Sequence, residues 1–415
     1  MVFYLAIAVA TVALAALVRL EPERMDACRQ TSGSFGKDKD AQPGVCGKQN
    51  EGALGYVDTG VRLCACRGYG AKGVSRRQAC NMLCLFSIFT ILFAVSACRL
   101  NVGNDYAKYV EFMHLIACGA ANYVPTEVGF NVLVAALYWL SGSENFLLVF
   151  GVFAFFTIGL FLKAMYEQSD SFGWSFFLFM AFGFYFSTFN TVRYYLALAL
   201  ALYAVKYVLK REWGKFLLAV LVGAAFHKSM FVVILLYPLA ALAWKKWQLA
   251  LMALFCTTFF FMQDFYLRAV VFLYPSYEDT EYLEGGVSWF NILRCAGVLA
   301  LSFLYYRQAV EGSRRNRFYF FCNLGALVLY TCCSFLPIIT RIGYYLNMTQ
   351  ILFIPAILVK IKDRRQRRFW SVAVALAAAG YFALYLMRAG QDGIRVLPYR
   401  TFMFHEMVPI LSDVN

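Results

Sequence analysis

Long apolar blocks recur along most of this chain and are separated by short polar segments. Blocks without any charged residue lie at 2–18, 81–98, 145–162, 174–189, 247–263, 342–359 and 369–387. Further apolar blocks, which are shorter or hold one charge, lie at 194–209, 216–226, 230–243, 290–306 and 318–340. Because a membrane-spanning helix needs roughly 20 such residues, the pattern predicts an all-α, polytopic integral membrane bundle of about 11 to 12 transmembrane helices.

The composition excludes a water-soluble enzyme. Of the 415 residues, 61% are hydrophobic and only 15% are charged, and 41 Phe, 27 Tyr and 7 Trp are present. A soluble domain is about half apolar and about a quarter charged. The mean hydropathy of +0.60 agrees with a membrane protein.

The net charge of +14 is explained by where the basic residues lie. Four short segments are rich in Lys and Arg: 206–215, 245–246, 307–317 and 360–368. Segments 99–127, 264–289 and 388–415 are together net acidic. Basic loops mark the cytoplasmic side, so the first set is predicted to lie inside and the second outside, with both termini facing outward. A nucleic-acid partner is therefore not expected.

The chain divides into four predicted parts. These are a first transmembrane helix (1–19), a polar cytoplasmic insertion (20–80), a polytopic catalytic membrane domain (81–387) and an outward-facing tail (388–415). The insertion contains or adjoins several cysteines. A zinc site in this part of the chain would use Cys64-x-Cys66 and Cys80-x3-Cys84. This spacing departs from the usual pairs, so we expect a poorly ordered insertion without chemistry.

Two regions are too short to span comfortably. Segment 128–140 is interpreted as a re-entrant or membrane-lying helix on the outer side, because a full crossing would invert the sidedness of all later loops. Segments 216–226 and 230–243 flank His227. Short or broken helices survive at membrane depth only where protein or a wet cavity satisfies their backbone, which indicates a cavity beside His227.

Five polar clusters fall on the predicted outer face. They are Arg99 to Tyr109, Phe189 to Tyr195, Phe226 to Ser229, Pro337 to Tyr345 and Pro398 to Arg400. Charges inside a membrane usually line a cavity or have a partner. Arginine suits planar, bidentate recognition of phosphate, so Arg99, Arg193 and Arg341 together would suit a lipid pyrophosphate.

Structural roles compete with these functional ones. Arg99 could anchor the chain at the headgroups, Asp105 could cap a helix and His227 could be a satisfied core histidine. For Arg294 and His114 a structural role is favoured. No acidic pair indicates a metal site, and no phosphate-binding glycine loop, dinucleotide fingerprint or nucleophile elbow occurs, so neither a metal nor a cofactor is expected.

The same clusters resemble the EpsG family of bacterial exopolysaccharide and capsule polymerases, a Wzy-like group. The resemblance covers about residues 81–405. The matching pieces are Arg99-x-Asn101-x-Gly103-Asn104-Asp105-Tyr106-x2-Tyr109, Phe189-Asn190-x2-Arg193, Phe226-His227-x-Ser229, Arg341-x2-Tyr344 and Pro398-Tyr399-Arg400. The chain departs from the family where Asn104 replaces a frequent Thr and where Tyr194 replaces a frequent Gln.

The resemblance implies a GT-C-like membrane glycosyltransferase. Such a protein joins oligosaccharide repeat units carried on undecaprenyl pyrophosphate at the outer face of the bacterial cytoplasmic membrane, in exopolysaccharide, capsule or O-antigen biosynthesis. Its partners would be the lipid-linked oligosaccharide and membrane lipid, with room for a chain-length regulator and a flippase. The expected site residues are, for catalysis, His227, Asp105, Arg193 and Arg341 and, for substrate binding, Arg99, Asn101, Tyr106, Asn190, Tyr344, Tyr399 and Arg400.

The general base is left open between His227 and Asp105, with His227 slightly favoured. Three other functions compete with the polymerase: a lipid-linked sugar transporter or flippase, a GT-C transferase that uses a polyprenyl monophosphate sugar, and a membrane acyltransferase. Clustering of the polar residues on one face favours an enzyme over a transporter, whose arginines would line a path to both faces.

Overall fold

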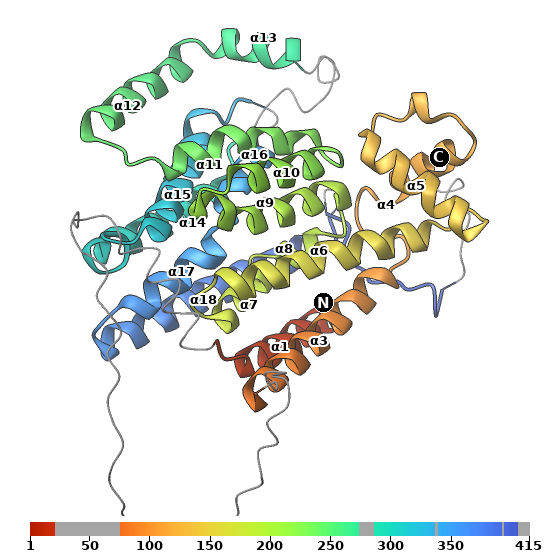
Figure 1. Ribbon diagram of the computed structural model, residues 1–415, viewed down its shortest axis with the longest axis horizontal. Coiled ribbons are helices and arrows are strands. Elements are labelled where there is room, and N and C mark those ends of the chain that lie inside the picture. Colours follow the sequence, from red (N-terminus) through yellow and green to blue (C-terminus); the bar gives the residue numbers. More distant parts are fainter. Residues whose placement is uncertain (21–74, 274–285, 337–338, 392–393, 406–415) are drawn as a thin grey trace, which may run out of the picture.

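The chain folds as a bundle of helices (Figure 1). The computed structural model describes residues 1–20, 75–273, 286–336, 339–391 and 394–405. Within these ranges there is no strand, only an isolated bridge between Arg99 and Thr401. The predicted all-α class is therefore confirmed. Most of the insertion at 20–80 and the last ten residues of the tail lie outside the described residues.

The described helices follow one another along the chain. In chain order they are α1 (Val2–Leu17), α3 (Arg76–Ala97), α4 (Tyr106–Ala117), η1 (Ala121–Tyr123), α5 (Val128–Ser141), α6 (Phe146–Gln168), α7 (Phe172–Ala181), α8 (Phe184–Ser187), α9 (Val192–Lys210), α10 (Trp213–Ala224), η2 (Lys228–Val232), α11 (Val233–Ala241), α12 (Lys246–Phe261), α13 (Gln263–Leu273), α14 (Trp289–Leu304), η5 (Tyr306–Val310), α15 (Arg314–Cys332), α16 (Ile339–Asn347), α17 (Gln350–Lys360) and α18 (Arg364–Arg388).

Five helical segments of the described chain are long and apolar enough to cross a membrane. They are Arg76–Ala97, Phe146–Gln168, Val192–Lys210, Ile339–Lys360 and Arg364–Arg388. Other apolar helices have only 10 to 17 residues. One reason is that apolar blocks are interrupted: the block at 174–189 is divided into α7 and α8 at Gly183, whose φ of 73° suits a residue without a side chain. The protein is thus a multi-pass membrane protein built from long and broken helices.

Helix α9 is the central element of the bundle. It packs against α6 on one side and α10 on the other (Figure 1). Most of its length is buried, from Val192 to Val208. Small residues such as Ala197, Ala201 and Ala204 are fully enclosed there and let the neighbouring helices approach closely. The first turn of α9 is therefore held rigidly, and it carries Arg193.

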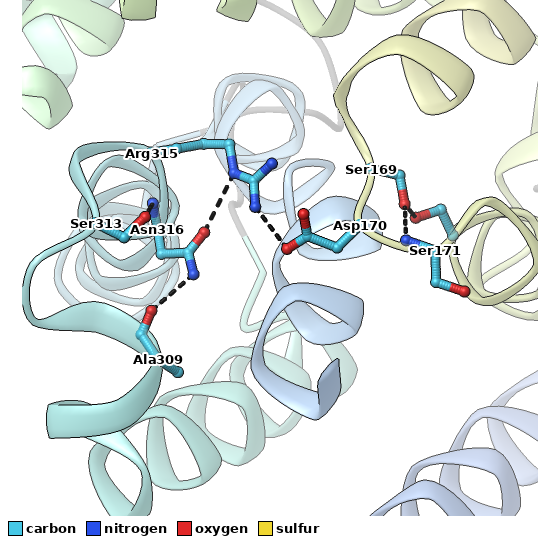
Figure 2. A network of polar contacts seen from close by, with 8 residues as sticks. Ser169, Asp170, Ser171, Ala309, Ser313, Arg315 and Asn316 are labelled. Atoms are coloured by element: carbon cyan, nitrogen blue, oxygen red, sulfur yellow. Dashed lines mark hydrogen bonds and ion pairs between the residues drawn. The ribbon is translucent and has the colours of Figure 1, made fainter. Parts of the chain in front are cut away.

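The basic segments gather at the end of the bundle opposite to that first turn. At the end of α9, Lys206 Nζ lies 2.7 Å from Glu167 Oε2 at the end of α6. Figure 2 shows the neighbouring network, in which Arg315 Nη2 lies 2.5 Å from Asp170 Oδ2. Asn316 Nδ2 of the same helix donates to the carbonyl of Ala309 at 2.7 Å. The structure therefore separates a basic end from a motif-bearing end, as the charge pattern predicts.

Helices α4 and α5 lie between the end of α3 and the start of α6, at the motif-bearing end. The Gly129 N–H of α5 donates to the Ala225 carbonyl at 2.9 Å. A side chain at Gly129 would meet that carbonyl oxygen at 2.5 Å. The segment predicted as an outer-side helix thus docks on the end of α10. The sidedness of this end in the membrane stays a prediction.

Removal of one member of the Arg315–Asp170 ion pair is expected to destabilise the bundle. The side chains of Arg315 and Asp170 are only 14% and 12% exposed. Asp170→Asn removes the carboxylate charge that faces the guanidinium, and loss of one partner of a largely enclosed ion pair costs of order 3 kcal/mol. We expect a clearly lower thermal midpoint in detergent. Glu212→Gln, which breaks the exposed Lys215–Glu212 pair, is the control and should leave the midpoint unchanged; equal midpoints for both variants would contradict the structural role.

Candidate active site

The site begins with an ion pair between Arg193 and Glu127. Arg193 lies in the first turn of α9, and its Nη1 contacts Oε2 of Glu127, the residue that precedes α5. The two side chains are only 12% and 17% exposed. The Arg193 guanidinium carbon also lies 5.5 Å from the Tyr109 ring centroid and 5.3 Å from that of Phe130. The guanidinium is therefore held by one carboxylate and two aromatic rings.

Glu127 connects this arginine to the histidine cluster. Its second oxygen, Oε1, accepts the backbone N–H of Lys228 at 3.0 Å. The sequence pattern does not pair Glu127 with Arg193, because 66 residues separate them. The signal in the sequence that could have pointed to Glu127 is its position: it follows Pro125-Thr126 and precedes the segment predicted as an outer-side helix. Glu127 thus orients both Arg193 and the turn that carries His227.

The hydrogen bonds of His227 define its tautomer. The Ser229 N–H donates to His227 Nδ1 at 3.4 Å, and Ser229 Oγ lies 2.7 Å from the same nitrogen. Ser229 Oγ is also 2.9 Å from the hydroxyl of Tyr345. A nitrogen that accepts a backbone N–H carries no proton, so the neutral ring holds its proton on Nε2. In this arrangement the neutral ring of His227 can donate a hydrogen bond through Nε2.

Electrostatics keeps His227 neutral. Burial is the largest influence and, together with the positive charges of Arg193, Arg341 and Lys228, it lowers the pKa of His227 to about 3. The imidazolium form is therefore disfavoured throughout the physiological range. This agrees with a neutral ring that donates through Nε2.

Asp105 and Arg341 complete the cluster. Burial raises the pKa of Asp105, and the charges of Arg341, Lys108 and Arg193 oppose this rise. Arg341 is exposed, and its backbone carbonyl accepts the hydroxyl of Tyr194 at 2.5 Å. The Tyr194 ring lies 5.2 Å from the ring of His227. The four residues predicted to be catalytic thus lie within electrostatic reach of one another.

A tight turn brings Asp105 to the start of α9. Gly103 has a φ of 110°, and an added side chain would meet the Phe189 carbonyl oxygen at 2.3 Å. The next residue, Asn104, donates its N–H to Asn190 Oδ1 at 3.1 Å. Only glycine allows this close approach. The first two sequence clusters are therefore joined through Gly103 and Asn190.

Arg99 does not join this cluster. It is 1% exposed, its Nη1 donates to the Ser96 carbonyl and to Ser96 Oγ, and its guanidinium carbon lies 5.0 Å from the rings of Phe150 and Phe189. This differs from the expectation that Arg99 contacts pyrophosphate, because packed helices cover the side chain on all sides. Tyr106, another expected substrate-binding residue, is fully buried and stacks on Phe150 at 4.5 Å.

The C-terminal motif fastens the tail to the end of α3. Leu100 N–H donates to the Arg400 carbonyl at 3.0 Å, and the Tyr399 hydroxyl donates to the Val95 carbonyl at 3.0 Å. Asn101 lies in the same turn with a φ of 51°. These expected substrate-binding residues therefore support the site from its rim, and of the three only Arg400 is exposed. Asn190 and Tyr344 line a separate cavity beside the cluster.

One group of candidate metal ligands occurs among the described residues. It consists of His114, Cys118 and Glu144, all exposed. Glu144 Oε2 lies 2.8 Å from His114 Nδ1, whereas Cys118 Sγ lies 3.7 Å from Nε2. One ligand atom from each of the three residues lies within 4.8 Å of the others, at the protein surface. None of them belongs to the cluster around Arg193.

The fold and the cluster define the class of the protein: a multi-pass helical membrane protein whose polar residues converge at one end of the bundle. Within that class, the chain belongs to the EpsG family, whose family model matches residues 82–401. Membership points to a Wzy-like polymerase role in exopolysaccharide biosynthesis. No curated protein and no solved structure gives a significant match.

The protonation state of His227 can be measured directly. The chain has 3 histidines, so a His114→Gln, His405→Gln background leaves His227 as the single labelled ring for nitrogen NMR. We expect a neutral Nε2–H tautomer with no titration between about pH 5 and pH 8, because the lowered pKa lies below this range. Titration near pH 6.5, the unperturbed value, would contradict the burial and charge argument.

Proposed function

We propose that this protein is a polysaccharide polymerase that joins undecaprenyl-pyrophosphate-linked oligosaccharide repeat units at the outer face of the bacterial cytoplasmic membrane. The observation that carries the proposal is the convergence of Arg193, Arg341, Asp105 and His227 at one end of the bundle. Family membership supports it. The acidic outer loops and basic opposite end support the orientation.

The reaction exchanges one bond for another at an anomeric carbon. The hydroxyl oxygen of an acceptor sugar attacks that carbon, and its bond to the pyrophosphate oxygen breaks. The leaving lipid pyrophosphate takes the electron pair, so negative charge develops on it in the transition state. Arg193 and Arg341 supply fixed positive charge at that position, which is the electrostatic stabilisation that such a leaving group needs.

Asp105 is assigned as the general base that accepts the hydroxyl proton. Its raised pKa makes the carboxylate a stronger base than an exposed aspartate. His227 is assigned as a neutral donor, because Ser229 occupies Nδ1 and leaves the proton on Nε2. The Nε2–H can hydrogen-bond a pyrophosphate oxygen as charge develops. This reverses the slight preference for His227 as the base that the sequence alone supports.

The rival functions fit this arrangement less well. A flippase would carry a headgroup through to the opposite end. There the Arg315–Asp170 ion pair and the hydrogen bond from Asn316 to Ala309 hold neighbouring segments together. A transferase that uses a polyprenyl monophosphate sugar remains the alternative enzyme. Two arginines beside the base favour the more highly charged pyrophosphate.

The Arg193 assignment is tested with purified protein and a synthetic undecaprenyl-pyrophosphate repeat unit. Wild type should give a ladder of extended products on a gel. Arg193→Lys should lose most extension, by about 100-fold, because an ammonium cannot make the bidentate contact and cannot lie flat between two rings.

Arg317→Lys, at the basic end, is the matched control and should give a normal ladder. A normal ladder from Arg193→Lys would overturn the pyrophosphate assignment. Relocation of intact lipid between leaflets without any ladder would support the flippase instead.

A second pair of variants separates base from donor. Asp105→Asn should reduce extension by about 10²–10⁴-fold, the usual contribution of a general base. His227→Gln should be milder, since its amide also donates a hydrogen bond. Because the pKa of Asp105 is raised, extension in wild type and in His227→Gln should fall together as the pH drops through that pKa. A severe loss in His227→Gln with near-normal extension in Asp105→Asn would reverse the two roles.

A further inference from the structure

A second cavity lies beside the catalytic cluster and is not used by the proposed chemistry. Its volume is about 270 Å³, enough for one sugar ring and too little for a chain. Its walls come from α8, α9, α14, α16 and α18, together with Phe182 after α7 and the turn before α9. The residues that line the cavity include Asn190, Tyr195, Phe290, Asn291, Tyr344, Tyr381, Tyr385 and Arg388.

The walls of this cavity suit a carbohydrate. Four tyrosines provide flat faces, on which sugar rings can stack, and hydroxyl groups at their tips. Asn190, Ser187 and Ser288 add small polar groups. The cavity therefore combines apolar faces with several hydrogen-bonding groups, as small-molecule sites generally do.

The cavity is also positively charged. Arg294 lies behind its wall: the guanidinium carbon is 4.8 Å from the ring centroid of Phe182 and 5.4 Å from that of Tyr381, both of which line the cavity. Arg294 Nη2 donates to Asn291 Oδ1 at 2.9 Å, whereas Nε and Nη1 are buried without a hydrogen-bond partner. The exposed Arg388 stands over Phe290 at the rim, 4.6 Å from its centroid.

No acidic residue is found among the described residues that line this cavity, and no ion pair joins Arg294 to a carboxylate in the described part of the chain. A buried guanidinium without a carboxylate is costly in a membrane protein. Aromatic rings lower that cost in part, but the electric field of Arg294 still reaches the cavity through a low-dielectric wall. An anionic group in the cavity would neutralise it.

Asn190 joins this cavity to the reaction site. Its Oδ1 accepts the N–H of Asn104, next to Asp105, while the residue also lines the cavity. Tyr194 and Tyr195 follow Arg193 in the first turn of α9; the first faces His227 and the second faces the cavity. The cavity therefore lies beside the catalytic cluster, on the other side of the same helical turn.

We propose that this cavity is a saccharide subsite that binds a negatively charged sugar residue, such as a uronic acid, of the oligosaccharide repeat unit. The proposal rests on the proposed function for the identity of the oligosaccharide. Stacking on the tyrosines holds the ring, and Arg294 and Arg388 select the carboxylate. The subsite positions the repeat unit so that its neighbouring sugar reaches Asp105 and Arg193.

The test compares two probes that differ only in charge. Methyl β-glucuronide and methyl β-glucoside are titrated into the full-length protein in nanodiscs, and binding is followed by saturation-transfer NMR. We expect the glucuronide to bind about tenfold more tightly. Arg388→Gln should reduce this preference and Arg294→Gln should abolish it. Equal binding of the two glycosides by wild type would overturn the charge selection.

A matched pair on α18 tests the location. Leu384→Trp places an indole in the cavity and should abolish binding of both glycosides, whereas Leu376→Trp, two turns earlier and outside the cavity, should leave binding unchanged. Unchanged binding in Leu384→Trp would overturn the site. If Arg294→Gln does not fold, Arg388→Gln, an exposed position, decides the role of charge.

Arg193→Lys separates this inference from the proposed function. The variant should bind the glucuronide as wild type does while failing to extend lipid-linked substrate. Selective binding by a wild-type protein that makes no ladder would support the subsite and count against the polymerase. A ladder without selective binding would overturn the subsite and leave the polymerase standing.

Discussion

The Arg193–Glu127 ion pair is the contact on which the motif-bearing end of this protein depends. A guanidinium at the start of a buried helix needs a partner, since its desolvation otherwise costs several kcal/mol. Glu127 supplies that partner from the start of α5, and its other oxygen accepts the N–H of Lys228. One carboxylate thereby fixes three segments that are far apart in the sequence. Arg341 is the second guanidinium of the cluster, and unlike Arg193 it is exposed.

Aromatic rings are the second means by which this chain accommodates charge. Arg99, Arg193 and Arg294 each lie against two or three ring faces. Some of the many Phe and Tyr residues therefore hold charged side chains inside the bundle. The surroundings of the three arginines differ: Arg99 is enclosed in the core, Arg193 is also paired with Glu127, and Arg294 lies behind the wall of a cavity.

The sequence predicts the class of fold, the separation of a basic end from a motif-bearing end, and the residues of the catalytic cluster. It does so because hydropathy and charge position are local properties. Pairings such as Glu127 with Arg193, or Tyr345 with Ser229, depend on how helices meet, and no local signal encodes them. For the same reason Arg99 and Tyr106, in a motif shared with Asp105, were expected in the site and lie in the core instead. The tautomer of His227 likewise follows from a neighbouring N–H that only the folded turn provides.

The claim that Glu127 acts by orienting Arg193 toward a leaving pyrophosphate is tested most directly by a double-mutant cycle on polymer extension. Extension rates are measured for wild type, Glu127→Gln, Arg193→Lys and the double variant, with the same lipid-linked repeat unit. If Glu127 acts through Arg193, each single change is costly and the double variant is no slower than Arg193→Lys alone. Losses that multiply in the double variant would show that the two residues act independently and would contradict this account.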